Sequence, residues 1–297
     1  MSFLDYPERE PMGAMGAACH ERSVELAARA TGGRQHSYGS DPFQRLLVHA
    51  APEPTGEVVL AWHGGGWTHG FKEWMAMMAP PLNRRGISLV SAGYRLAPEH
   101  LFPTGLDDCE AALAWLAGHL DEIGGDASRV FLSGHSAGGH YASLMALRPA
   151  RPGRLPIAGC LPISGVFKLG EGSGLTQRPR FLGAAPSAEV DRTASPLDQP
   201  LAGAPPFLLT WGERDFPHLI VQARHMAEAL RLAQVPVRTL ELPGCDHFEA
   251  CYASAEMDGA WIQAATAFMR DHNDATTSRC SATLCVSAMR RAVSSIA

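Results

Sequence analysis

The segment Gly134–Gly138 constrains the fold more than any other stretch of the chain. It reads Gly-His-Ser-Ala-Gly and lies between an apolar run at 129–132 and a helix-forming run at 141–147. A strand that turns sharply into a helix needs small residues, because Cβ atoms would collide at the turn. The pattern predicts that Ser136 lies at the tip of a strand, with the N-terminus of the next helix facing developing negative charge. A chance Gly/Ser turn is the alternative, and the flanking strand and helix favour a nucleophile.

Composition and charge narrow the classes of protein to which the chain can belong. Of the 297 residues, 46% are hydrophobic and 19% are charged, which is typical of a globular protein with a large core. The formal net charge is -5 and no Lys/Arg cluster is present, so nucleic acid is not an expected partner. No stretch approaches the ~18 apolar residues of a membrane span, and the N-terminus does not resemble a secretory signal. We therefore expect a cytoplasmic protein with no membrane partner.

The cysteines indicate neither a disulfide framework nor a metal site. Seven are present, an odd number, without C-x-x-C pairs, which favours free thiols in a reducing compartment. Cys245, Asp246, His247 and Cys251 could be read as a metal cluster, but their spacing matches no known ligand set. We expect no metal and no other cofactor.

Strand-like and helix-like segments alternate along the chain. Helices of this length between strands imply right-handed crossovers, and hence an α/β fold with a mainly parallel sheet covered on both faces. The strand 237–242 comes late in the sheet and could support a homodimer, as edge strands often do. The expected strands are 43–50, 57–62, 87–92, 130–133, 157–163, 206–211 and 237–242, and the expected helices outside the Ser136 region are 20–30, 72–85, 107–120, 219–233 and 256–270.

The chain divides into an arm, a catalytic domain and a tail. Residues 1–40 are expected to form an N-terminal arm, either over the substrate entrance or, as the favoured interpretation, as a simple extension. Residues 41–272 form the catalytic domain, and their weakly periodic, Gly/Pro/Ser-rich stretch 166–204 predicts a small cap over the site. Residues 273–297 are expected to be a disordered tail, with a short amphipathic helix as the alternative.

Residues just after the strands are the candidates for chemistry, because sites in parallel sheets lie beyond the carboxyl ends of the strands. Ser136, Asp215 and His247 follow three different strands in the order of an α/β-hydrolase triad. His247 suits proton transfer near neutrality, and Asp215 would fix its tautomer. Glu213, two residues earlier, is the alternative to Asp215 as the acid of the triad. Asp246 is interpreted as a turn residue.

A run of three glycines follows the strand 57–62 and predicts an oxyanion hole. Backbone N–H groups can converge on an oxyanion only where no side chain obstructs them, so Gly65, Gly66 and the N–H of Ala137 are the expected donors. Losing one such donor typically costs about 2.7 to 4 kcal/mol of transition-state stabilisation. A flexible hinge is the weaker reading. The expected pocket walls are Trp67, Phe216 and Phe248, and the histidines expected to brace loops are His63, His135 and His140.

Several motifs resemble a known family. The sequences HGGGW at 63–67, YRLAPEH at 94–100 and GHSAGG at 134–139 resemble the hormone-sensitive-lipase-like branch of α/β-hydrolase carboxylesterases. RDFP at 214–217 and CDHFE at 245–249 resemble kynurenine formamidases (arylformamidases), which share the fold. The resemblance covers roughly residues 38–272 and implies an α/β-hydrolase fold with a small cap. The site residues it implies are Ser136, Asp215 and His247 as the triad, with Glu99 and His100 bracing the oxyanion loop.

These observations predict a serine carboxylesterase that hydrolyses short- to medium-acyl esters through an acyl-enzyme. Arylformamidase activity on N-formylkynurenine, with the same triad, is the first alternative. A hydrolase-fold protein that binds its ligand without turnover is the second. The expected partner is accordingly a small-molecule ester or aryl formamide, and the small cap makes long-chain lipase activity a weaker expectation.

Overall fold

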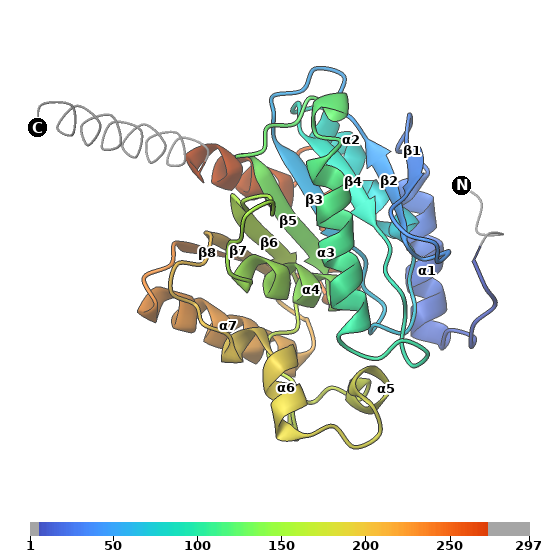
Figure 1. Ribbon diagram of the computed structural model, residues 1–297, viewed down its shortest axis with the longest axis vertical. Helices are drawn as coiled ribbons and strands as arrows, with labels where there is room; N and C mark the ends of the chain where they lie inside the picture. Colours follow the sequence, from blue (N-terminus) through green and yellow to red (C-terminus); the bar gives the residue numbers. More distant parts are fainter. Residues whose placement is uncertain (1–5, 273–297) are drawn as a thin grey trace, which may run out of the picture.

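Eight strands form one sheet in the order β1-β2-β4-β3-β5-β6-β7-β8 in the computed structural model, which describes residues 6–272 (Figure 1). The pairs β1–β2 and β2–β4 are antiparallel, and the other neighbours are parallel, which confirms the mainly parallel sheet. The strands are β1 (Arg34–Ser37), β2 (Arg45–His49), β3 (Val58–Trp62), β4 (Ser88–Ala92), β5 (Val130–His135), β6 (Gly159–Ile163), β7 (Phe207–Gly212) and β8 (Val237–Leu242).

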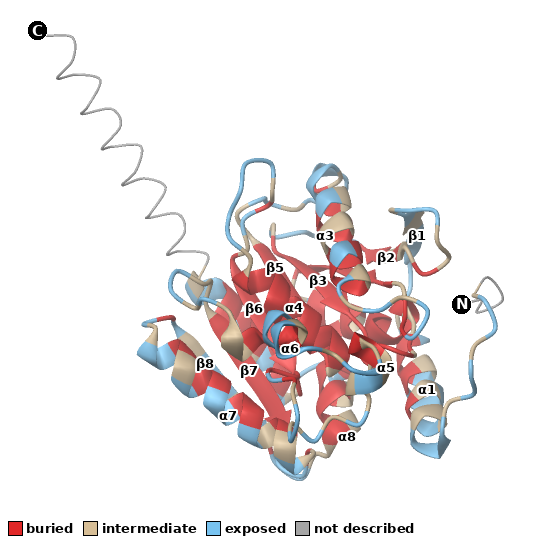
Figure 2. Ribbon diagram, turned by 60° about the horizontal axis from the view of Figure 1, so that its bottom comes forward, coloured by how far each residue is buried: buried red, intermediate tan, exposed pale blue. Residues whose placement is uncertain are grey.

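The central strands are covered on both faces, as their nearly continuous apolar sequences require. Every residue of β3, β4, β5, β6 and β7 is buried, and Figure 2 shows this buried centre in red. Successive side chains of a strand point to opposite faces. Leu60 and Leu132 therefore pack into one hydrophobic cluster, whereas Val59 and Phe131 pack into the other.

Helices supply the outer layer on each face of the sheet. The cluster that contains Leu60 is completed by α3 (Thr104–Ala117), α4 (Ala137–Leu147) and α7 (Pro217–Leu232). The cluster that contains Val59 is completed by α1 (Ala14–Ala27), α2 (Ala79–Asn83), α8 (His247–Tyr252) and a helical segment at 260–272. The α/β fold with helices on both faces is therefore confirmed.

Several expected boundaries differ from the structure. The helix expected at 20–30 is α1, which begins at Ala14, and the helix expected from 256 begins at residue 260. The helix expected at 72–85 is a 3₁₀ segment, Lys72–Met78, followed by α2, whose first turn contains Pro80 and Pro81. Proline cannot donate a helical hydrogen bond, so it fits only where a helix begins.

Strand β1 was not predicted, and it shows that part of the segment assigned to the N-terminal arm belongs to the sheet. Its residues are polar and mostly exposed, so they lack the alternation that marks a half-buried strand. It pairs with β2, so a boundary at residue 40 would separate β1 from the sheet to which it belongs. The opposite edge strand is β8.

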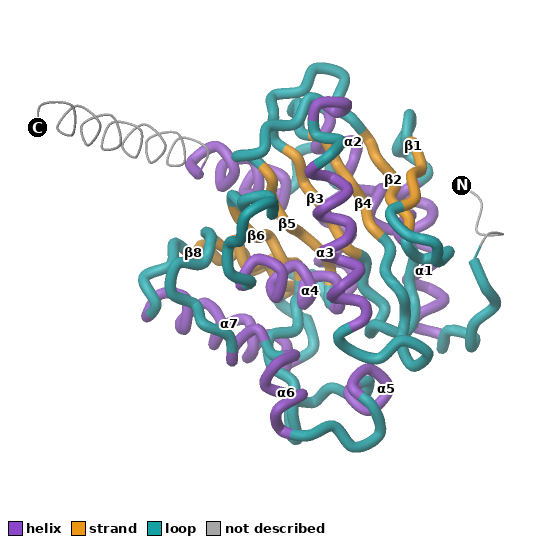
Figure 3. Tube along the Cα trace, in the orientation of Figure 1, coloured by secondary structure: helices purple, strands orange, loops and turns teal. Residues whose placement is uncertain are grey.

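The excursion at 166–204 lies beyond the carboxyl ends of the strands. It contains the short helices α5 (Arg178–Leu182) and α6 (Ala188–Ala194), linked mainly by loops (Figure 3). The expected tail at 273–297 lies outside the described residues. Within residues 6–272, no helix combines the length and apolar character needed to cross a bilayer.

Candidate active site

Ser136 occupies a strained turn between β5 and α4. Its φ is 54° and its ψ is -115°, a positive-φ conformation that is uncommon for a residue with a side chain. A Cβ atom at Gly138 would lie 2.0 Å from the Trp62 carbonyl oxygen, which explains why glycine stands there. The N–H of Ser136 donates to the Ile163 carbonyl at 2.9 Å, which ties the turn to β6.

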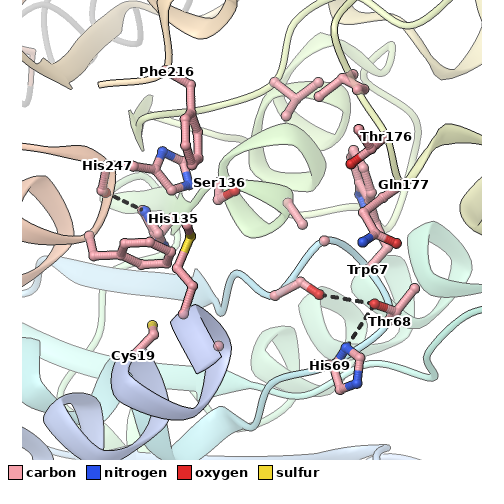
Figure 4. Close-up of a pocket in the computed structure, with 18 of the residues that line it drawn as sticks. Cys19, Trp67, Thr68, His69, His135, Ser136, Thr176, Gln177, Phe216 and His247 are labelled. Carbon is pink, nitrogen blue, oxygen red and sulfur yellow. Dashed lines mark hydrogen bonds between the residues drawn. The ribbon is translucent and has the colours of Figure 1, made fainter. Parts of the chain in front are cut away.

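His247 and Asp215 form a buried hydrogen-bonded pair. The His247 Nδ1–H donates to Asp215 Oδ1 at 2.8 Å, and the N–H of Phe216 donates to the same oxygen at 2.7 Å. Burial raises the pKa of Asp215, whereas the hydrogen bond and charge of His247, together with further hydrogen bonds, lower it, and the net shift is downward. Because Nδ1 carries the proton, Nε2 is left to accept one. Figure 4 shows the imidazole directed toward Ser136.

Local structure places each member of this pair and separates it from its rivals. Asp246 is the N-cap of α8, where its side chain accepts from Phe248 and Glu249 in a capping box, so His247 is the first residue of the helix. The rival acid, Glu213, accepts from the N–H of Gly244 at 2.6 Å instead of contacting His247. Asp246 is thus a cap residue, and Asp215 is the acid that is hydrogen-bonded to the imidazole.

The glycine loop after β3 adopts a left-handed backbone beside Ser136. Gly65, Gly66 and Trp67 have φ values of 109°, 61° and 63°. A Cβ atom at Gly65 would lie 2.2 Å from the His69 carbonyl oxygen, and one at Gly64 would lie 3.3 Å from Ser136 Cβ. Of the backbone hydrogen bonds described for residues 6–272, none uses the N–H of Gly65, Gly66 or Ala137. These three donors are therefore open to a ligand.

Three buried histidines brace the loops around the site. His63 bonds to the Gly64 carbonyl through Nδ1 at 2.7 Å, and His135 bonds to the His247 carbonyl through Nε2 at 2.9 Å. His140 accepts from Trp67 Nε1 at 3.1 Å and donates to the Ala194 carbonyl at 2.7 Å. The pKa of His63 and of His140 is lowered to about 4, and that of His135 to about 3. Burial is the largest cause in each case. All three rings are neutral at pH 7.

Of the two residues implied to brace the oxyanion loop, Glu99 and His100, Glu99 is connected to the loop indirectly. Glu99 pairs with Arg9 at 2.8 Å, and Arg9 donates to the Thr68 carbonyl at 3.3 Å. Glu99 therefore reaches the loop through Arg9 and the N-terminal segment. For His100 the structure gives a backbone bond to the Leu96 carbonyl at 3.1 Å.

These elements enclose a cavity of about 490 Å³ that Ser136 and His247 both line. The three expected wall residues, Trp67, Phe216 and Phe248, all border it. Phe216 lies with its ring centroid 4.7 Å from that of His247. Trp67 is only 2% exposed and stacks on Phe181 at 4.2 Å, so its main contacts are with the core and the cap. Trp67 thus borders the cavity, as expected, and also packs against the core and the cap.

Two walls of this cavity come from the N-terminal arm, whose place over the substrate entrance was the less favoured expectation, and from the predicted cap. Helix α1 and the residues before it supply Met12, Met15, Gly16 and Cys19, so the N-terminal arm is a wall of the cavity and not a simple extension. The cap supplies Gln177, whose Oε1 is buried with no hydrogen-bond partner in the part of the chain that is described. The apolar residues at 12, 15 and 19 have helical spacing, which is the one signal that could have indicated a buried face.

The cysteines and acidic residues form no metal centre within residues 6–272, because no three His, Cys, Asp or Glu side chains gather closely enough. Cys245 and Cys251 are free thiols, as are Cys19, Cys109 and Cys160. The site thus offers a hydroxyl, an imidazole and a carboxylate, with three backbone donors. Together they can carry out nucleophilic acyl transfer.

Comparisons with known proteins identify the family and several relatives of this chain. The family model described as alpha/beta hydrolase fold matches residues 59–250, more than half of the chain. Esterase LipC of Mycobacterium tuberculosis is 32% identical over 265 residues, covering 81% of this chain and 64% of the relative. LipM of the same organism, a probable carboxylic ester hydrolase, is 32% identical over 212 residues, covering 65% and 49%. The chain thus spans less than two thirds of the length of these curated relatives.

A solved structure is similar over nearly all of its own length. EstE1, a thermostable carboxylesterase cloned from a metagenomic library, superposes with a TM-score of 0.73 at 25% identity, covering 86% of this chain and 96% of EstE1. The family match, the sheet order and the strained serine turn lead to one conclusion. This chain belongs to the α/β-hydrolase fold family.

Proposed function

We propose that this protein is a serine carboxylesterase that hydrolyses esters of short- to medium-chain acyl groups. The observation that carries the proposal is the 2.8 Å bond between His247 and Asp215 at the wall of a cavity that Ser136 also lines. A serine hydroxyl is a weak nucleophile until a base lies beside it, and the base must itself be oriented. The relatives support the proposal, since LipC and EstE1 carry the names of an esterase and a carboxylesterase.

The proposed reaction proceeds through an acyl-enzyme. Ser136 Oγ attacks the ester carbonyl carbon while His247 Nε2 takes the hydroxyl proton, and Asp215 stabilises the resulting imidazolium. The oxyanion of the tetrahedral intermediate accepts hydrogen bonds from the N–H groups of Gly65, Gly66 and Ala137. His247 then protonates the departing alcohol. In the second half, water loses its proton to His247, attacks the acyl carbon and releases the acid with regeneration of Ser136.

The cavity suggests the size and character of the acyl group. A volume of about 490 Å³ lies at the lower end of the range for ligand pockets. Its walls include Met12, Met15, Phe216 and Phe248, which suit an apolar acyl chain of modest length.

The proposal includes a homodimer that pairs through the exposed edge strand β8. Light scattering during size-exclusion chromatography would measure the mass of the particle in solution.

Initial rates on p-nitrophenyl acetate, butyrate and palmitate, and on N-formylkynurenine, would test the proposal. We expect the two short esters to have the highest kcat/KM, and Ser136→Ala to abolish turnover and covalent labelling by an organophosphonate. A kcat/KM far higher for N-formylkynurenine would identify an arylformamidase. A wild-type protein that neither turns over nor labels would be a ligand-binding protein.

A further inference from the structure

We propose that Ser164 is a positioning residue of the active site, whose hydroxyl holds the second carboxylate oxygen of Asp215. The inference rests on the proposed function only in that Asp215 orients His247 for hydrolysis. Oδ1 of Asp215 already accepts from His247 and from the N–H of Phe216. Oδ2 is buried, and no partner with good hydrogen-bond geometry faces it among residues 6–272. This oxygen therefore needs a donor.

Ser164 is the side chain that can supply this donor. The residue is 1% exposed, and its Oγ is also buried with no well-aligned hydrogen-bond partner among the described residues. Burial raises the pKa of Asp215, whereas His247 and then the Ser164 hydroxyl lower it by hydrogen bonding. A buried donor and a buried acceptor are each unfavourable alone, and a hydrogen bond between them removes both costs.

The backbone at Ser164 indicates that the serine is held there under strain. It follows β6 directly, and its φ of 49° lies in the left-handed region. Glycine would adopt this conformation without strain, so a serine here is explained by what its side chain contacts.

The peptide unit between Ile163 and Ser164 also connects the nucleophile to the acid. Its carbonyl accepts from the N–H of Ser136 at 2.9 Å, and its N–H donates to the Thr210 carbonyl on β7 at 2.7 Å. β6 and β7 are neighbouring strands, so Ser164 at the end of β6 and Asp215 after the end of β7 lie beyond adjacent carboxyl ends. One strained residue thus fixes the serine turn on one side and the carboxylate on the other.

Thr210 offers a matched control on the neighbouring strand. Its hydroxyl is also buried without a partner in the described part of the chain, yet Thr210 is not among the groups that shift the pKa of Asp215. Thr210→Val removes a buried hydroxyl close to Ser164 with little change of volume. A general packing effect would act on both positions, whereas a positioning effect would act on Ser164 alone.

Steady-state kinetics on p-nitrophenyl butyrate provide the first test, with Ser164→Ala and Ser164→Gly compared with Thr210→Val. Glycine relieves the strained φ, so Ser164→Gly is expected to fold even if Ser164→Ala does not. We expect roughly 10- to 100-fold lower kcat at Ser164 with KM changed less than about twofold, because a hydrogen bond to a charged group is lost. In an Asp215→Asn background, Ser164→Gly should cause no comparable further loss.

Proton NMR provides a second test that does not require turnover. The His247 Nδ1–H resonance reports the hydrogen bond to Asp215, so it should shift in Ser164→Gly and stay in place in Thr210→Val. Wild-type kcat and an unmoved resonance in Ser164→Gly would overturn the proposal. A wild-type protein that does not hydrolyse esters would instead contradict the proposed function, and the resonance would still decide the role of Ser164.

Discussion

The two sides of the cavity are held in place by different kinds of interaction. On the sheet side, Ser136 and His247 are fixed by buried hydrogen bonds and by glycines that no other residue could replace without a clash. On the opposite side, the cap rests on the sheet side through the buried hydrogen bond from His140 to the Ala194 carbonyl and the stack of Phe181 on Trp67. Where the cap meets the N-terminal segment, the contact includes the ion pair between Glu10 and Arg180, whose side chains are 69% and 36% exposed. Exposed ion pairs contribute only about 0 to 1 kcal/mol.

The difference separates reaction chemistry from substrate choice. Reacting groups must keep their geometry within a fraction of an ångström, and the sheet side provides such rigidity. The α1 and cap side borders the same cavity with Met12, Met15 and Gln177, none of which belongs to the sheet. Substitutions on the sheet side should therefore change kcat, and substitutions on the other side should change discrimination between substrates.

The largest expected effect is at the acid of the sheet side. Asp215→Asn should lower kcat by about 10⁴-fold, because an amide cannot fix the same tautomer or stabilise the imidazolium. Glu213→Gln should stay close to wild type, since Glu213 contacts Gly244 and not His247. Kinetics on p-nitrophenyl butyrate would measure both. The reverse ranking would make Glu213 the acid.

A fall in pH should lower the free energy of unfolding, because of the buried histidines on the sheet side. The unfolded chain protonates histidine near pH 6.5, whereas His63 and His140 do so in the fold only near pH 4, so the unfolded state binds more protons between these values. Stability is therefore lost as pH falls from 7 to 5, by about 2 kcal/mol for each ring. Urea unfolding at both pH values would measure it. His140→Gln should reduce the loss, and replacement of the exposed His225 by Asn should not.

The glycine loop should show a smaller but clear effect on kcat. In Gly65→Ala, a Cβ would approach the His69 carbonyl to 2.2 Å, so the loop must move and the oxyanion donors with it. We expect about a 100-fold lower kcat on p-nitrophenyl butyrate. Gly153→Ala is the matched control, because Gly153 also has a positive φ but open space around it. Equal kcat losses in the two variants would remove the loop from the mechanism.

The smallest effect is expected on the cap side. Gln177→Leu should lower kcat/KM for p-nitrophenyl methoxyacetate by about 2- to 10-fold relative to the butyrate ester, because the ether oxygen loses a hydrogen-bond donor. Thr193→Ala, an exposed cap substitution outside this cavity, should leave the ratio unchanged. A ratio that does not move in Gln177→Leu would exclude contact between this side chain and the acyl group.

The parts that could be predicted from sequence are those that depend on local chemistry. A serine turn requires small neighbours such as Gly138, and an oxyanion loop requires consecutive glycines such as Gly65 and Gly66. Each motif directly follows an apolar run, so the parallel sheet brings the motifs to one edge. The α/β-hydrolase fold and the meeting of Asp215 with His247 followed from this reasoning.

The parts that could not be predicted depend on contacts between distant segments. Gln177 lies in a stretch without periodicity, and its place at the cavity wall arises only when the cap folds back. The stacking of Trp67 on Phe181 was not predicted, because the two residues lie far apart in the chain. Strand β1 was missed because an exposed polar edge strand has no apolar alternation. Ser164 carries no motif, and only its φ and its orphaned hydroxyl distinguish it.

Intact-protein mass spectrometry during turnover would test most directly the claim that Ser136 forms an acyl-enzyme. Wild-type protein quenched with acid while hydrolysing p-nitrophenyl butyrate should carry one butyryl group, and peptide mapping should place it on Ser136. The Ser136→Ala variant should carry none and should not turn over. Hydrolysis that persists in Ser136→Ala, or an adduct that maps to another residue, would contradict the account.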